Sequence, residues 1–250
     1  MPVFDPRERS IPVLPSVILA NIIPLVAIIS YDFSFFSLIY LYWWETVLLS
    51  IFNFMKMGSA NKTGEPDPNL KINGRVLSHE QVNNRKYMRR MYIFVRMGML
   101  IFYLIFIVVF IGVLGMDRGD DPAKFGETIL LIDPWIRIGL AAFFITHLLE
   151  YIVWRRDGSA AETTLRELGS PFDARVIVMH LVIVLGTFLS MFVTESMFPN
   201  NPKAGSIAYA SIFVILKTIV DLLAYVKNTK RTTVITALQP RPSPQNENRP

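Results

Sequence analysis

Apolar residues along this chain fall into six long blocks that are separated by short polar segments. The blocks run approximately over residues 11–29, 35–55, 91–114, 135–154, 176–198 and 206–226. Each is long enough to cross a hydrocarbon core of ~30 Å, which takes ~20 helical residues. The pattern predicts an all-α, polytopic membrane protein whose residues 1–230 form a bundle of six transmembrane helices. The remaining segment, 231–250, is predicted to be a disordered tail because it is polar and rich in proline.

The positive charges alternate between the two sides of this predicted bundle. Outside the spans, 19 lysines and arginines lie in the terminal segments and in the loops that follow the second and fourth blocks, against 4 in the other loops. Cytoplasmic loops of membrane proteins carry the excess of Lys and Arg. Both termini are therefore predicted to be cytoplasmic, and the protein to be integral to the cell membrane.

Composition narrows the chemistry that the chain can perform. Of its 250 residues 52% are hydrophobic and none is cysteine, which excludes disulfides, thiolate metal sites and iron–sulfur ligation. The net charge of +5 does not indicate nucleic-acid binding, because the basic residues gather at one side of the predicted membrane. No phosphate-binding loop, no GxSxG elbow and no HExxH motif occurs.

A basic cluster precedes the third block in the segment NNRKYMRRMY. Its members are Arg85, Lys86, Arg89 and Arg90. The plainer interpretation is that they set the orientation of the span. The other is that they contact anionic lipid head groups at the cytoplasmic face.

Besides Arg137, which lies at the edge of the fourth block and is counted with the loops, eight ionisable residues lie inside the predicted spans, where charge is costly and marks candidate functional sites. They are Glu45, Arg96, His147, Glu150, His180, Glu195, Lys217 and Asp221. Arg96 and Glu195 lie near span ends and are expected to reach water.

Counting inward from the cytoplasmic ends, Glu45 and Lys217 both lie about 14 Å deep. A lone charge at such depth costs roughly 2.5–3.5 kcal/mol, and pairing offsets much of this cost. Asp221 follows Lys217 by one helical turn and shares its face. We expect Glu45, Lys217 and Asp221 to form a buried ion network, which serves either as a structural ion pair or as part of a path for protons or ions.

Two histidines and an acid lie closer to the cytoplasmic surface, at the depth of Asp221. His147 and Glu150 are three residues apart and share one helix face, as in helical carboxylate–histidine metal sites. The set His147, Glu150, His180 and Asp221 is a candidate metal or haem site if the helices are neighbours. The competing interpretation is that both histidines pack within the protein through hydrogen bonds.

Several of these residues lie in segments that resemble a known family. The segments are WWETVLLSIFNFMKM, SPFDARVIVMHLVIVLGTFL and VILKTIVDLLAYVKNTKR. They resemble a family of uncharacterised prokaryotic membrane proteins, domain of unknown function 6498, over roughly residues 40–230. The resemblance implies that Glu45, His180, Lys217 and Asp221 belong to one constellation, but it brings no established activity. Members often carry histidines in the third span, where this chain has none and Arg96 lies near one expected place, which puts metal binding by that route in doubt.

Three functions remain open, and the sequence does not decide whether the protein is an enzyme. The first is a non-catalytic or accessory subunit of a larger membrane complex, with other membrane subunits as partners. It is favoured by the short loops and the lack of a cofactor motif. The second is a metal- or haem-linked membrane redox protein that uses the histidines, and the third is a proton-coupled transporter that uses Glu45, Lys217 and Asp221.

Overall fold

The computed structural model describes residues 13–31, 33–66, 71–72, 75–113, 122–169, 197–198 and 200–238. Within these residues the protein is mostly helical, as the sequence predicted. The only strands there are two strands of two residues each, which pair as an antiparallel hairpin. The elements in chain order are α1 (Val13–Ser30), α2 (Phe35–Met57), β1 (Lys71–Ile72), β2 (Arg75–Val76), α3 (His79–Asn83), α4 (Arg85–Phe106), the π-helix η1 (Ile107–Val113), α5 (Pro122–Ile129), α6 (Pro134–Arg156), α7 (Ser159–Glu162), α8 (Leu165–Leu168) and α10 (Pro202–Leu238).

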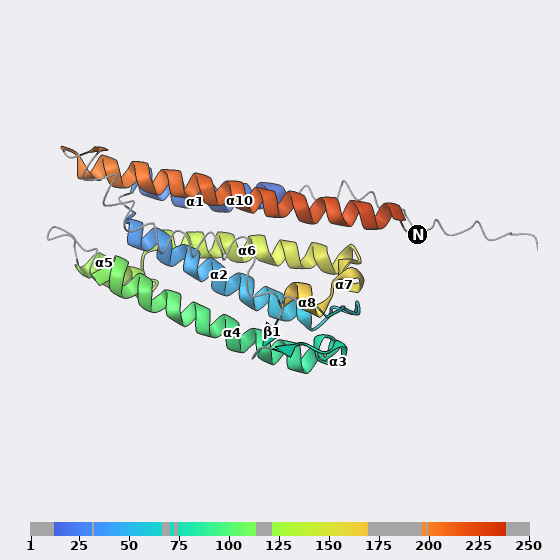
Figure 1. The fold of residues 1–250 in the computed structure, drawn as a ribbon. Helices are drawn as coiled ribbons and strands as arrows, with labels where there is room; N and C mark the ends of the chain where they lie inside the picture. The colour runs from blue at the N-terminus through green and yellow to red at the C-terminus, as the bar shows by residue number, and fades with distance from the viewer. Residues whose placement is uncertain are drawn as a thin grey trace, which may run out of the picture.

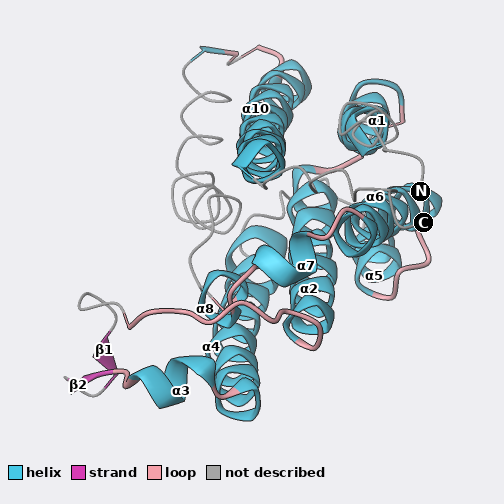
Figure 2. Ribbon diagram, turned by 90° about the vertical axis from the view of Figure 1, so that its right-hand side faces the viewer, coloured by secondary structure: helices cyan, strands magenta, loops and turns pink. Residues whose placement is uncertain are grey.

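The long helices run side by side, and their axes are roughly parallel (Figure 1). Seen along these axes, α1 and α10 lie on one side of α2 and α6, and α4 lies on the other side of α2 (Figure 2). α1 packs against both α6 and α10, while α2 packs against α6 and α4. This arrangement places α2 and α6 between the other helices, where their side chains can meet those of α10.

Polar residues determine where the long helices begin. The Ser34 side chain accepts a hydrogen bond from the Ser37 amide at the start of α2, and Asn84 does the same for α4. Asp133 caps α6 and is followed by Pro134 in the first turn. Such caps satisfy amide groups that have no partner within the helix, so the apolar blocks are bounded by local chemistry as well as by hydropathy.

Among the residues that the structure describes, four helical segments are long and apolar enough to cross a membrane: Val13–Ser30, Phe35–Met57, Arg85–Val109 and Ala123–Arg156. They contain or closely overlap the first four predicted spans. The predicted sixth span, 206–226, lies inside α10, whereas nearly all of the fifth, 176–198, lies outside the described residues. α10 continues to Leu238, past residue 230 where the predicted tail begins, and 239–250 lie outside the described residues.

The outer surfaces of these helices are apolar. On α4 the side chain of Phe94 is 82% exposed, and Phe102 and Ile105 are also largely uncovered. On α1 the same holds for Leu19 and Ile29. Contiguous apolar surface of this kind is rare on soluble monomers and is what a helix facing lipid presents.

The interior is built mainly around α2. Leu38, Ile39, Leu41 and Tyr42 are fully buried there and belong to one large hydrophobic cluster that also takes in side chains of α1, α4, α6 and α10. Gly139 of α6 lets that helix approach α2 closely, because a Cβ at Gly139 would lie 2.6 Å from Leu41 Cδ2.

A small second cluster forms a cap at one end of the bundle. The cap consists of the described residues between α2 and α4, including α3 and the hairpin, together with α7 and α8. Its apolar centre includes Met57, Val82 and Leu165. A backbone bridge between Lys62 and Thr164 joins its two parts. The start of α1 and the end of α10 lie at this same end of the molecule (Figure 1).

Candidate buried ion network

Lys217 of α10 lies at the centre of the candidate site. Its Nζ is 2.6 Å from Glu45 Oε2 of α2 and 2.6 Å from Asp221 Oδ2 one turn along α10. It also donates a hydrogen bond of 3.1 Å to Asn21 Oδ1 of α1. Oxygen atoms of three different residues thus surround an ammonium group that has three N–H donors. The structure thus brings together the three residues Glu45, Lys217 and Asp221 of the predicted ion network.

Two aromatic rings close the space around this ammonium group. Nζ lies 4.7 Å from the ring centroid of Tyr42 and 4.7 Å from that of Phe143. Both rings are fully buried. They exclude water and add cation–π attraction, which strengthens when the cation is desolvated. Lys217 is only 5% exposed, so its charge is compensated by protein groups rather than by solvent.

Asn21 is a member of the site that the sequence analysis missed. Its Nδ2 donates to Asp221 Oδ2 at 3.1 Å and to the Val17 carbonyl at 2.9 Å, which directs its Oδ1 towards Lys217. The search for charged residues passed over it because an amide carries no charge. Its position as the one amide of the first apolar block was the available signal.

His147 of α6 extends the site on the other side of Glu45. Its Nε2 is 3.8 Å from Glu45 Oε1, and its Nδ1 is 3.1 Å from Glu150 Oε2. The imidazole is buried, and within the described part of the chain its Nε2 makes no hydrogen bond. The Glu150 side chain is 17% exposed, so this end of the site is nearer to solvent than the Lys217 end.

Five ionisable side chains therefore follow one another from α10 through α2 to α6. We call this series the ionisable chain: Asp221, Lys217, Glu45, His147 and Glu150. Taken alone, it holds three carboxylates against one lysine and one histidine. Carboxylates and an imidazole in series inside a bundle of this kind are groups that can take up and release protons.

The candidate metal or haem site is only partly placed. His147 and Glu150 are in direct contact, but His180 lies outside the described residues. Asp221 is bound by Lys217, whose ammonium group lies between it and Glu45. Among the described residues, no group of three or more His, Asp or Glu side chains is arranged to hold a metal ion.

Arg96 does not lie where the sequence analysis expected it. It was expected to reach water from a span end, but it is buried, and its Nε donates a 2.7 Å hydrogen bond to Ser50 Oγ of α2. The reason is that α4 begins at Arg85, before the predicted start of the span at residue 91. Arg96 is therefore about 16 Å along the helix from its first residue.

The four residues of the basic cluster occupy two different environments. Arg85 donates to the Ala60 carbonyl at 2.9 Å, and the Arg89 guanidinium lies 3.9 Å from the centroid of the Phe54 ring. Lys86 and Arg90 are exposed. The first pair is held by the protein, and the second pair faces its surroundings.

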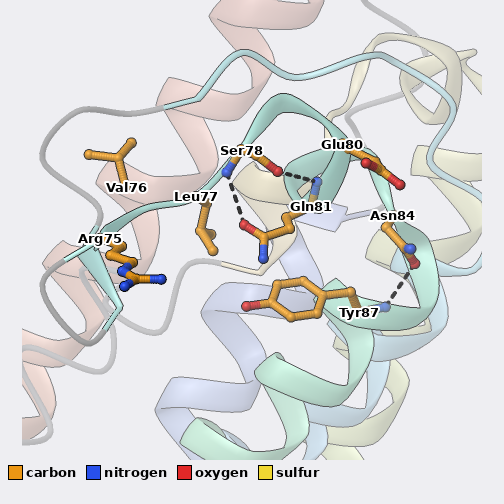
Figure 3. Close-up of a pocket in the computed structure, with 8 residues that line it drawn as sticks. All are labelled: Arg75, Val76, Leu77, Ser78, Glu80, Gln81, Asn84 and Tyr87. Carbon is orange, nitrogen blue, oxygen red and sulfur yellow. Dashed lines mark hydrogen bonds between the residues drawn. The ribbon is translucent and has the colours of Figure 1, made fainter.

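An open pocket of about 810 Å³ lies in the cap, away from the ionisable chain (Figure 3). Ser78 and Gln81 in its wall form a capping box, and Asn84 accepts a hydrogen bond from the Tyr87 amide. These polar groups are thus used for starting α3 and α4. The pocket carries no chemistry comparable to that of the ionisable chain.

Comparison with known proteins identifies a family of unknown function. No curated protein matches the chain, and no solved structure does. The model of a family of unknown function, DUF6498, matches residues 4–237. The chain therefore belongs to this family, over more of its length than the resemblance covered.

Proposed function

We propose that this member of the DUF6498 family is an integral membrane protein that translocates protons through the ionisable chain as part of a transporter. The proposal includes six transmembrane helices, termini in the cytoplasm and location in a prokaryotic cell membrane, the last from the resemblance that the sequence carries. The solute that moves with the proton is left open.

The distribution of charge and the arrangement of the loops support this topology. The two connections that form the cap are those rich in lysine and arginine, and they lie at the same end as the start of α1 and the end of α10 (Figure 1). An odd number of crossings between these two points would place them at opposite ends. The cap end is therefore the cytoplasmic end by the positive-inside rule.

The observation that carries the proposal is the continuity of the ionisable chain. Each member lies within 3.8 Å of the next, from Asp221 at one end to Glu150 at the other. Two static ion pairs would not need a histidine between two acids. Chains of Asp, Glu and His inside a membrane mark proton relays in pumps and transporters.

His147 supplies the step that moves a proton. When Glu150 is protonated, it gives its proton to Nδ1 of the imidazole, and the imidazolium then gives the Nε2 proton to Glu45. Glu150 and Glu45 exchange charge, and His147 returns to neutral. The gap between Nε2 and Glu45 Oε1, at 3.8 Å, is longer than a hydrogen bond, so a small approach of α6 to α2 controls this step.

Protonation of Glu45 would change how the helices hold together. A neutral Glu45 attracts Lys217 less strongly, and Lys217 then keeps Asp221 of its own helix as its main partner. The contact between α10 and α2 weakens, whereas the one within α10 stays. Proton binding is thereby coupled to a movement of helices, which a transporter requires.

Proton flux into liposomes tests this function. The protein is reconstituted with a pH-sensitive dye inside, and a potassium gradient with valinomycin drives protons inward. The native protein is expected to give flux well above that of protein-free liposomes, and the double variant Lys217→Met with Asp221→Asn to give none above them. Arg75→Gln, an exposed change in the cap, is the matched control and should keep the native rate. Equal flux in native protein, double variant and empty liposomes would overturn the proposal.

A second candidate function is the accessory subunit, in which the same residues only hold helices in place. The observation that favours it is that oxygen atoms of Glu45, Asp221 and Asn21 already lie within 3.1 Å of Lys217 Nζ. This role predicts stoichiometric membrane partners on purification from native membranes, together with no proton flux. A stable monomer that conducts protons would exclude it.

A further inference from the structure

The outward face of α4 carries two exposed basic residues that the ionisable chain does not use. Lys86 and Arg90 are one helical turn apart, and neither makes a hydrogen bond or ion pair with the part of the chain that the structure describes. Their neighbours Arg85 and Arg89, in contrast, are held by Ala60 and Phe54. Arg85 is exposed as well, but its guanidinium is engaged by the protein, so Lys86 and Arg90 are the members of the basic cluster best placed to bind an outside ligand.

The same face continues as an apolar stripe. At spacings of three or four residues after Arg90 come Phe94, Met97, Ile101 and Ile105, which are 82%, 49%, 50% and 57% exposed. Residues at these spacings lie on one side of a helix. This face of α4 therefore changes from basic to apolar between Arg90 and Phe94. We place the membrane boundary on α4 at this level.

Gly98 has no side chain to cover the helix surface between its neighbours on α4. It lies one turn from both Phe94 and Phe102, and no atom lies within 4 Å of where its Cβ would be. The rings of Phe94 and Phe102 are exposed on either side. The surface between them has room for a hydrocarbon chain that runs along the helix.

We propose that Lys86 and Arg90 bind the phosphate of one anionic phospholipid, whose acyl chain lies along the stripe from Phe94 to Ile105. The charge is complementary, and an arginine guanidinium can bind a phosphate through two parallel hydrogen bonds. The apolar continuation of the same face distinguishes a lipid from a free phosphate, which would gain nothing from the stripe. Arg85 and Arg89 position the start of α4 and take no part in binding.

Native mass spectrometry of the purified protein with added phosphatidylglycerol or phosphatidylcholine tests this site. Wild-type protein is expected to retain one phosphatidylglycerol in preference to phosphatidylcholine. Lys86→Gln with Arg90→Gln should weaken that binding roughly 10- to 30-fold, since each basic residue near a membrane surface contributes about one kcal/mol. The matched control is Arg75→Gln with Arg156→Gln, which removes two exposed charges elsewhere at the same end.

The control variant should bind phosphatidylglycerol like the wild type, and millimolar inorganic phosphate should not displace the lipid. Equal loss in both double variants would show a general charge effect and overturn the site. Displacement by inorganic phosphate would show that the apolar stripe contributes nothing and would overturn it as well. All these changes are at exposed positions, so circular dichroism is expected to show the same helix content throughout.

Discussion

The protein contains a lysine–glutamate ion pair in each of two very different regions. Lys217 and Glu45 meet inside the bundle with 2.6 Å between Nζ and Oε2, and both side chains are less than 10% exposed. Lys62 and Glu162 meet in the cap at 3.4 Å, where their side chains are 46% and 36% exposed. The chemistry is identical, but solvent screens the second pair and not the first. The position of each lysine, and not its residue type, therefore determines how strongly its ion pair acts.

The largest expected effect is the loss of protein stability when the buried pair of Lys217 and Glu45, here called the inner pair, is broken. Lys217→Met leaves Glu45 and Asp221 buried without their cation, and breaking a buried pair in this way costs about 3–5 kcal/mol. Thermal unfolding in detergent, followed by circular dichroism, should show a large fall in Tm. Lys217→Met with Glu45→Gln removes both charges of the pair and should recover a large part of the loss. If the double variant is no more stable than the single, the charges are not coupled.

Asn21 gives a smaller effect in the same region. Asn21→Leu removes the amide that bonds both Lys217 and Asp221, and leaving such buried groups without a partner costs about 1–3 kcal/mol. The matched control is Ser16→Ala, which removes a polar group at the start of the same helix that bonds only the local Val13 carbonyl. A loss for Asn21→Leu no greater than for Ser16→Ala would contradict the role of Asn21 in the network.

A substitution in the cap should destabilise the cap alone and leave the stability of the helix bundle unchanged. Asn83 joins the cap by accepting from the Gly64 amide at 2.7 Å and donating to the Gly64 carbonyl at 3.0 Å. Asn83→Ala is expected to cost about 1 kcal/mol. Amide hydrogen exchange should rise in residues 58–66 and 159–168, while the bundle keeps its Tm. Increased exchange in α2 and α6 as well would show that cap and bundle unfold together.

The smallest effect on protein stability is expected for the exposed pair of Lys62 and Glu162, here called the outer pair. Lys62→Gln or Glu162→Gln should change stability by roughly 0–1 kcal/mol, because exposed ion pairs gain little in water. Any change should shrink further in high salt, whereas the effect of Lys217→Met should not. An outer-pair loss close to that of the inner pair would break the comparison.

Helical geometry explains which parts of the site could be predicted. The pairing of Glu45 with Lys217 follows from counting 1.5 Å per residue along two spans, and the shared faces of Lys217 with Asp221 and His147 with Glu150 follow from helical periodicity. The contact between His147 and Glu45 did not follow, because the count placed them about one helical turn apart in depth. Two side chains that lean towards each other can span that difference.

The parts that sequence reasoning missed depend on contacts between distant segments. Asn21 meets Lys217 across 196 residues, and nothing in the first block alone shows which helix will lie beside it. The cap was interpreted as loops, since turn-forming residues show where helices stop but not that two connections will pack together. Arg96 was misplaced because the first six residues of α4 are mostly polar, so the hydropathy pattern did not include them in the predicted span.

Proton flux in liposomes that contain the His147→Gln variant tests whether the ionisable chain carries protons. His147 lies between the two acids, and a glutamine in its place is of similar length and has an amide that can also bond Glu150, so the replacement should disturb the fold little. We expect a Tm close to that of the native protein together with flux reduced to the level of protein-free liposomes. A folded His147→Gln variant that conducts protons at the native rate would contradict it.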